Sequence, residues 1–266
     1  MPESTNVSGA AVGPAAARSG PMRVVPVIDL KNGSVVRGVA GQREIYRPIQ
    51  SRLVSSAQPA AVGRALAELG FRDVYVADLD AIAGREPAWP IYAELLDCGL
   101  QLMVDAGPST VEQVIAMRGF HSCGRRIAAI VAGLESLRSI GSLAAMRAAT
   151  GTAHFVFSLD LKAGRPLTNI PSWQRLSPMQ IATIALRAGV RRMIVLDLAA
   201  VGVSRGVPTT QLCRALACHD PTLEIIAGGG VRGPRDLCIL ESAGCTAALV
   251  ASALHDGRLS PEDCRR

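Results

Sequence analysis

Short, unbroken apolar runs rich in β-branched side chains recur along the chain. Such runs predict strands of a parallel sheet, because both faces of that kind of sheet are covered and neither face needs polar residues. Eight of them occur, at Val24–Ile28, Val74–Ala77, Leu102–Val104, Ile127–Val131, Phe155–Leu159, Met193–Leu196, Glu224–Ala227 and Ala247–Ala251.

Between these runs, apolar residues recur every three or four positions, which is the spacing of a helix with one buried face. The pattern is clearest at Pro59–Leu69, Ser109–Met117, Gly141–Ala149, Met179–Ala188 and Thr210–Ala217. Eight strands, each followed by a helix or by a connection long enough for one, predict an α/β protein with a (β/α)8 TIM barrel. A doubly wound sheet is the alternative, but it usually needs only five or six strands.

The two halves of the chain repeat one another. Three matches follow in the same order at nearly constant spacing, namely Asp29 with Asp160, Asp78 with Asp197, and Ala128–Gly133 with Ala247–Ser252. In the first match, an apolar run ends in Asp-Leu-Lys-x-Gly both times. The repeat predicts a barrel built from two repeated half-barrels, with the boundary near Thr150.

The first 21 residues are rich in Ser, Ala, Gly and Pro and contain no continuous apolar segment. They therefore do not resemble a secretory signal, and we expect a disordered tail, with Met22 as an alternative start. The expected organisation is a tail over 1–21, the barrel over 22–258 and a C-terminal tail over 259–266.

Composition narrows the class of protein. Apolar residues make up 49% of the chain and charged residues 19%, which excludes a disordered protein. No uncharged apolar stretch reaches the roughly 18 residues of a membrane span. The net charge is +6, but aromatic residues are only 3% and no basic run occurs, which disfavours a nucleic-acid partner. A small anionic ligand fits this balance better.

Cysteine and histidine usage favours neither disulfides nor a metal site. The seven cysteines are an odd number without a Cys-x-x-Cys pair, and the four histidines have no metal-ligand spacing. We therefore expect buried thiols in a reducing, cytoplasmic compartment, with no metal and no cofactor. The oligomeric state stays open.

Two aspartates are the leading candidates for catalysis. In a parallel barrel, the active site gathers where the C-terminal ends of the strands meet their loops. Asp29 ends the first predicted strand and Asp160 the fifth, so their carboxylates should face each other across the barrel mouth. Opposed carboxylates suit one general acid and one general base. The alternative is that each aspartate only caps the loop that follows it.

Small residues after the last two strands predict a phosphate site. Gly229 and Gly230 follow the seventh strand, and Ala251 and Ser252 follow the eighth. Loops at these positions commonly cradle phosphate in such barrels, because glycine lets backbone N–H groups approach the anion. Turn-forming glycines are the alternative.

The repeat places a second candidate phosphate site at Gly107 and Gly133, after the third and fourth strands. Asp105 and Glu135 stand beside these glycines and bring negative charge to the place that an anion would occupy. Both a phosphate site and a set of ordinary turns therefore stay open there.

A long loop at Val35–Arg52 follows the first strand and carries four arginines. Such a loop can act as a lid whose arginines bind phosphate. Arg37 lies nearest the strand and is the candidate for this role. The alternative is a solvated loop whose arginines provide solubility.

The segment Val27–Arg37 resembles the histidine-biosynthesis barrel family, which comprises the phosphoribosylformimino-AICAR-phosphate isomerase and the imidazole glycerol phosphate synthase cyclase. The likeness covers about residues 22–258 and includes Val76–Ala81, Leu159–Leu161, Gly228–Gly230 and Ala253–Gly257. The resemblance implies that Asp29 and Asp160 are the acid/base pair and that two opposed phosphate cradles hold a bisphosphorylated substrate. It also implies ring opening and an Amadori rearrangement of an aminoaldose phosphate to an aminoketose.

Departures from the family pattern gather at one end of the site. At the sixth strand, the isomerase pattern is Thr-Asp-Ile-x-Arg-Asp-Gly, and this chain has Leu-Asp-Leu-Ala-Ala-Val-Gly at Leu196–Gly202. Asp197 is therefore kept as a candidate substrate-binding residue, but Leu196 replaces the threonine hydroxyl. After the third strand, the family's Gly-Gly-Gly-Ile-Arg is replaced by Asp-Ala-Gly-Pro-Ser at Asp105–Ser109. After the fourth strand, the family's Gly-Thr-Ala is replaced by Ala-Gly-Leu-Glu at Ala132–Glu135. The chain is thus similar to a divergent HisA/HisF-related branch, with the second phosphate site remodelled.

Three functions stay open, all with a small phosphorylated metabolite as partner. The first is an isomerase of a phosphoribosyl-type sugar phosphate. The second is an enzyme of the same mechanism on another singly phosphorylated substrate, in pterin or C1-cofactor synthesis. The third is a non-catalytic binder of a phosphate ligand, which the paired aspartates disfavour. The cyclase reaction is less favoured, because it depends on a glutaminase partner.

Overall fold

The structure is a computed structural model that describes residues 22–264. The tail expected over 1–21 and the last two residues of the expected C-terminal tail lie outside the described residues.

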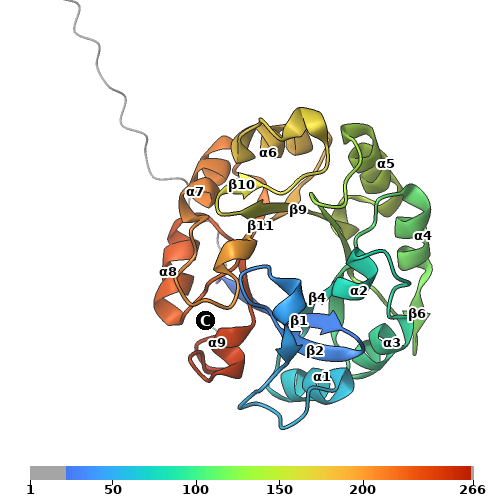
Figure 1. Cartoon of the computed structure of the whole chain (residues 1–266), viewed down its shortest axis with the longest axis vertical. Helices are drawn as coiled ribbons and strands as arrows, with labels where there is room; N and C mark the ends of the chain where they lie inside the picture. The colour runs from blue at the N-terminus through green and yellow to red at the C-terminus, as the bar shows by residue number, and fades with distance from the viewer. Residues whose placement is uncertain (1–21, 265–266) are drawn as a thin grey trace, which may run out of the picture.

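Eight parallel strands form a closed barrel (Figure 1). They are β1 (Arg23–Lys31), β4 (Asp73–Asp78), β5 (Gln101–Asp105), β8 (Ala129–Gly133), β9 (Phe155–Lys162), β11 (Arg192–Asp197), β12 (Glu224–Gly228) and β13 (Ala247–Val250). The barrel closes because β1 pairs in parallel with both β4 and β13. Each predicted apolar run overlaps one of these strands, so the (β/α)8 fold is confirmed. Its origin from two half-barrels stays a prediction.

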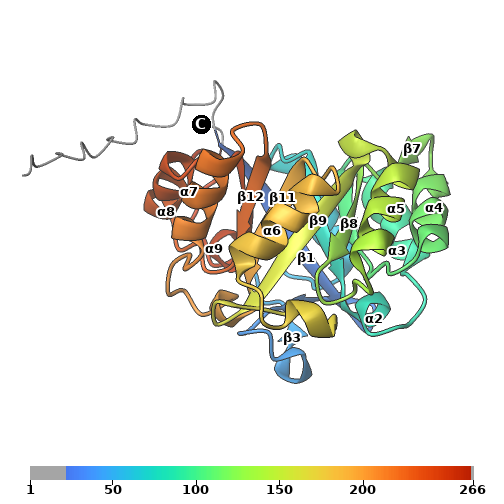
Figure 2. The same ribbon diagram turned by 90° about the horizontal axis from the view of Figure 1, so that it is seen from above.

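Helices surround the strands (Figures 1 and 2). They are α1 (Pro59–Glu68), α3 (Trp89–Asp97), α4 (Val111–Gly119), α5 (Ile140–Thr150), α6 (Pro178–Arg187), α7 (Thr210–His219) and α8 (Pro234–Ser242). Local sequence starts several of them, because Thr110, Ser139 and Ser177 form capping boxes at α4, α5 and α6. Within residues 22–264, no helix is long and apolar enough to cross a membrane.

Short strands and helices lie in the loops between the barrel elements. They are β2 (Ser34–Arg37), β3 (Arg47–Pro48), β6 (His121–Ser122), β7 (Arg125–Arg126), β10 (Arg165–Pro166), α2 (Leu79–Ile82) and α9 (Ser252–His255). Because β2 turns back antiparallel to β1, and β3 turns back on β2, the loop after β1 stays at one end of the barrel. Figure 2 shows β3 and α2 at this same end.

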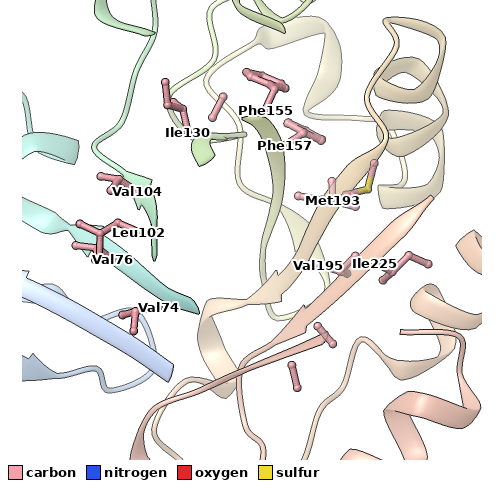
Figure 3. Close-up of a cluster of buried hydrophobic side chains, with 14 of the residues drawn as sticks. Val74, Val76, Leu102, Val104, Ile130, Phe155, Phe157, Met193, Val195 and Ile225 are labelled. Carbon is pink, nitrogen blue, oxygen red and sulfur yellow. The ribbon is translucent and has the colours of Figure 1, made fainter. Parts of the chain in front are cut away.

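Side chains alternate along each strand between two apolar layers. The larger layer lies between the strands and the helices, and Figure 3 shows its members Val74 and Val76 of β4 and Phe155 and Phe157 of β9. The residues between them, such as Tyr75, belong to a second layer inside the barrel. Alternation of this kind decides which polar residues near the strand ends turn inward.

Candidate active site

A cavity opens at the C-terminal ends of the barrel strands and encloses about 820 Å³ of empty space, including its mouth. Its charged and hydroxyl-bearing lining residues are Asp29, Arg43, Tyr46, Tyr75, Asp105, Glu135, Asp160 and Ser252. The candidate pair Asp29 and Asp160 therefore lines one cavity, together with the candidate residues Gly229, Gly230, Ala251 and Ser252.

Asp29 is the free carboxyl of the pair. It stands on β1 between its register partners Val36 of β2 and Ala77 of β4. Among the described residues, no group donates a hydrogen bond to its carboxylate. Burial raises the pKa of Asp29 to about 7, and the nearby charge of Arg43 limits the rise. A carboxyl group with this pKa can accept or release a proton near neutral pH.

Asp160 is held by its neighbours. Its side chain on β9 is only 5% exposed and accepts hydrogen bonds from Ser158 Oγ at 2.6 Å and from the Leu134 amide at 2.9 Å. Burial, together with the negative charges of Asp105 and Glu135, keeps the pKa of Asp160 well above its usual value. Burial and the neighbouring negative charges thus favour the protonated form of Asp160, while the two hydrogen bonds that it accepts favour the ionised form.

Asp105 and Glu135 add two further carboxyl groups to the same side of the cavity. Asp105 ends β5 and is only 6% exposed, and burial raises its pKa to about 7. The Gly107 amide donates a hydrogen bond to Asp105 at 2.9 Å, and the Tyr75 hydroxyl donates a longer one at 3.4 Å. Glu135 follows β8 and forms an ion pair with Arg43.

The loop after β2 lies over the cavity and is attached on both sides. On one side, the Ala40 amide donates a hydrogen bond of 2.8 Å to the Val201 carbonyl. A Cβ atom on Gly202 would lie 2.0 Å from the Gly38 carbonyl oxygen, so only glycine fits this contact. On the other side, Arg43 reaches Glu135. The expected lid thus bridges the loops after β11 and β8.

Glycine conformations form the wall opposite the carboxylates. Gly229 and Gly230 follow β12 with φ of +82° and +95°. A Cβ atom on Gly230 would lie 2.1 Å from the Gly206 carbonyl oxygen. Ser252 completes this wall, and Arg258 donates a hydrogen bond to its hydroxyl at 3.3 Å.

The remaining candidate residues lie elsewhere. Arg37 forms a bidentate ion pair with Asp256, at 2.7 and 2.8 Å, and does not line the cavity. Asp197 is buried and accepts hydrogen bonds from the amides of Ala163, Gly164 and Ala199, so it organises two loops. Its position one residue past Leu196, which lines the cavity, turns it to the other face of β11.

Gly107 and Gly133 also differ from an open phosphate cradle. Gly107 lies in a separate groove between the loops that follow β4, β5 and β8. A Cβ atom on Gly133 would lie 2.9 Å from Asp160 Oδ2 and 3.4 Å from Asp105 Oδ2. Two carboxylates therefore occupy the space above Gly133.

Tyr75 and Arg43 are cavity residues that were not among the predicted site residues. Strand alternation marks Tyr75 as inward-facing, since it stands between the outward Val74 and Val76. For Arg43 the sequence carries no comparable signal, because its partner Glu135 lies 92 positions away.

Comparison with known proteins places this geometry in a family. The model of the histidine biosynthesis protein family matches residues 23–260. The chain belongs to this family. Predicted family membership is thereby confirmed.

Relatives in this family extend over nearly the whole chain. An uncharacterized protein of Methanocaldococcus jannaschii is 32% identical over 243 residues, covering 91% of this chain and 97% of the relative. Two relatives are named 1-(5-phosphoribosyl)-5-((5-phosphoribosylamino)methylideneamino) imidazole-4-carboxamide isomerase. The one from Alkalilimnicola ehrlichii is 28% identical, covering 90% of this chain and 93% of the relative. The one from Thermus thermophilus is 27% identical, with 90% and 96% covered.

Proposed function

We propose that the protein is an isomerase that converts an aminoaldose phosphate to an aminoketose phosphate, with Asp29 and Asp160 as its acid/base pair. The observation that carries this proposal is the shared cavity, in which Asp29 accepts no hydrogen bond from the described residues and the pKa of Asp160 is raised by burial and by nearby negative charge. The names of the two isomerase relatives support a phosphoribosyl-type substrate.

The two carboxyl groups suit successive proton transfers. Protonated Asp160 donates its proton to the ring oxygen as the C1–O bond breaks, which leaves a protonated imine at C1. Ionised Asp29 then removes the proton from C2, the C2–H electron pair forms the enolamine, and tautomerisation gives the aminoketose. No electrons are gained or lost overall, so the reaction needs no redox partner.

The phosphate group belongs at the wall formed by Gly229, Gly230, Ala251 and Ser252. Positive φ angles favour glycine at both positions, and because glycine has no side chain, an anion can approach the backbone N–H groups there. Arg258 donates a hydrogen bond to Ser252 beside this wall and also forms an ion pair with Asp256. The rest of the cavity lining is apolar or bears carboxyl groups, apart from two tyrosines and Arg43, which is paired with Glu135, so a phosphate is favoured at this wall.

Turnover of two substrates tests this proposal. One is the bisphosphorylated compound that appears in the names of the isomerase relatives. The other is N-phenyl-5-phosphoribosylamine, which carries one phosphate. We expect turnover of at least one, with a loss of about a thousandfold in both Asp29→Asn and Asp160→Asn. Melting temperatures should stay close to that of the parent protein, because asparagine preserves side-chain shape.

Retained activity in either asparagine variant would contradict the acid/base assignment. Absence of turnover on both substrates, with phosphate binding intact, would favour the non-catalytic binder. Turnover of the singly phosphorylated substrate alone would favour the second candidate, an enzyme of the same chemistry outside the relatives' pathway, which Asp105 and Glu135 support by their negative charge.

A further inference from the structure

The cavity has two chemically different ends. The carboxylate wall consists of Asp105, Glu135 and Asp160, from β5, the loop after β8, and β9. The glycine wall consists of Gly229, Gly230, Ala251 and Ser252, from the loops after β12 and β13. A substrate that spans the cavity must therefore match two opposite electrostatic environments.

Carboxylate oxygens converge at the first of these ends. Asp160 Oδ2 and Asp105 Oδ2 lie 2.9 Å and 3.4 Å from the point where a Cβ atom on Gly133 would stand. Glu135 lies near both, since its charge contributes to the raised pKa of each. Two carboxyl groups directed at one point leave no room for a phosphate, and their ionised forms repel its charge.

Arg43 does not offset this negative charge for a ligand. It is the only cation lining the cavity among residues 22–264, and Glu135 already holds it in an ion pair. Asp29, also in the cavity, accepts no hydrogen bond from any described residue. The oxygens of Asp29 and the second carboxylate oxygen of Glu135 therefore remain for a donor on the ligand, whereas Asp105 and Asp160 already accept hydrogen bonds within the protein.

A positively charged nitrogen group is the ligand chemistry that fits these oxygens. An ammonium group offers three donors and a charge opposite to that of the wall. A metal ion is the other cation to consider, but no described group of three or more His, Cys, Asp or Glu residues is arranged to hold one. The donor set thus favours an organic cation.

We propose that the substrate carries a single phosphate at the glycine wall and a positively charged amino group at the carboxylate wall, where Asp105 and Glu135 select it. This inference rests on the proposed function, because it names the substrate class of the same cavity. It predicts discrimination against substrates with a phosphate at both ends.

Binding of three unreacted sugar phosphates tests this inference. The probes are glucosamine 6-phosphate, glucose 6-phosphate and fructose 1,6-bisphosphate, measured by titration calorimetry at pH 7. We expect the amino sugar phosphate to bind about tenfold or more tightly than glucose 6-phosphate, because only it carries the ammonium group. The bisphosphate should bind no more tightly than glucose 6-phosphate.

Variants of the carboxylate wall test whether this wall causes the preference for the amino sugar phosphate. In Asp105→Asn/Glu135→Gln, the preference for the amino sugar should fall to about twofold or less, with glucose 6-phosphate affinity retained. Glu68→Gln/Glu241→Gln is the matched control, because it removes two exposed carboxylates that do not line the cavity. This control should keep the full preference. The single variants Asp105→Asn and Glu135→Gln replace the double variant if it fails to fold.

Three results would overturn the inference: a parent protein without preference for the amino sugar, a preference that survives in the wall variants, or bisphosphate binding tighter than that of both monophosphates. Because these titrations need no turnover, they are independent of the acid/base test. Efficient isomerisation of the relatives' bisphosphate would overturn the substrate class while supporting the isomerase. Preference for the amino sugar phosphate without isomerisation of any substrate would support the substrate class and contradict the isomerase.

Discussion

The two catalytic candidates, Asp29 and Asp160, differ in their hydrogen bonding. Asp160 has a hydroxyl and an amide donor, while Asp29 has neither, although both side chains sit at strand ends in one cavity. Asp29 is therefore the carboxyl whose ionisation near neutral pH is available to chemistry, and Arg43 is the residue whose charge adjusts it.

The pH dependence of turnover should report the ionisation of Asp29. A base works only when ionised, so we expect kcat/KM to fall about tenfold per pH unit below its midpoint near pH 7. Arg43 lowers the pKa of Asp29, so Arg43→Met should move the midpoint upward by roughly half a unit or more. Initial rates between pH 5 and 9 measure this shift.

Arg47→Met is the matched control, since Arg47 is an exposed arginine of the same loop and does not line the cavity. Its midpoint should equal that of the parent protein. A midpoint that stays constant or moves downward in Arg43→Met would contradict the proposed coupling.

The loop after β2 connects distant elements over the cavity. Its attachments are the contact between Gly38 and Gly202 on one side and the pair of Arg43 and Glu135 on the other. Arg43 begins a short 3-10 helix, but neither attachment involves an α-helix or a strand, so the position of the loop depends on close packing with the loops after β11 and β8.

Gly202→Ala should release this loop. The new Cβ atom would lie 2.0 Å from the Gly38 carbonyl oxygen, so the two loops must separate. We expect kcat/KM to fall by about ten- to a hundredfold, because a displaced lid loses Arg43 from the cavity. Limited trypsin digestion should cleave the loop faster than in the parent protein.

Gly84→Ala separates this clash from backbone strain. Gly84 also has a positive φ, of +95°, but a Cβ atom there meets nothing within 4 Å. It should keep parental activity and trypsin resistance. Equal losses in both alanine variants would mean that backbone strain, and not lid contact, causes the effect.

The whole barrel is the unit that a ligand stabilises. Because β1 pairs with β13, Asp29 and the strands that lead into the glycine wall belong to one closed sheet. An anion bound at the glycine wall should consequently shift the unfolding equilibrium of the whole molecule.

Inorganic phosphate should raise the melting temperature. For a dissociation constant near 1 mM, about 10 mM phosphate should add roughly 3 °C relative to chloride at equal ionic strength. Gly230→Ala should abolish the shift, because its Cβ atom would lie 2.1 Å from the Gly206 carbonyl oxygen and distort the wall. Gly84→Ala should keep it. An equal shift in Gly230→Ala would place the anion elsewhere.

Much of the fold follows from local patterns in the chain. Apolar runs such as Phe155–Leu159 predict strands that are buried on both faces. The segments between the runs have helical spacing and predict the helices that cover these strands, so the order of strands and helices follows from the sequence. The strand-end position of Asp29 and Asp160 follows in the same way, because each directly ends an apolar run. These features depend on neighbours within a few residues.

The chemistry of the cavity depends on neighbours that are far apart in the chain. In the sequence, Gly133 is part of a candidate phosphate site, yet the side chains of Asp105 and Asp160 fill the space above it. Arg43 meets Glu135 across the barrel mouth, and Asp197 turns outward to bind loop amides. Closure of the barrel and packing of its loops bring these groups together, and no local periodicity records such contacts. Tertiary structure therefore decided which predicted residues share the cavity, and the chain's local patterns decided the barrel that holds them.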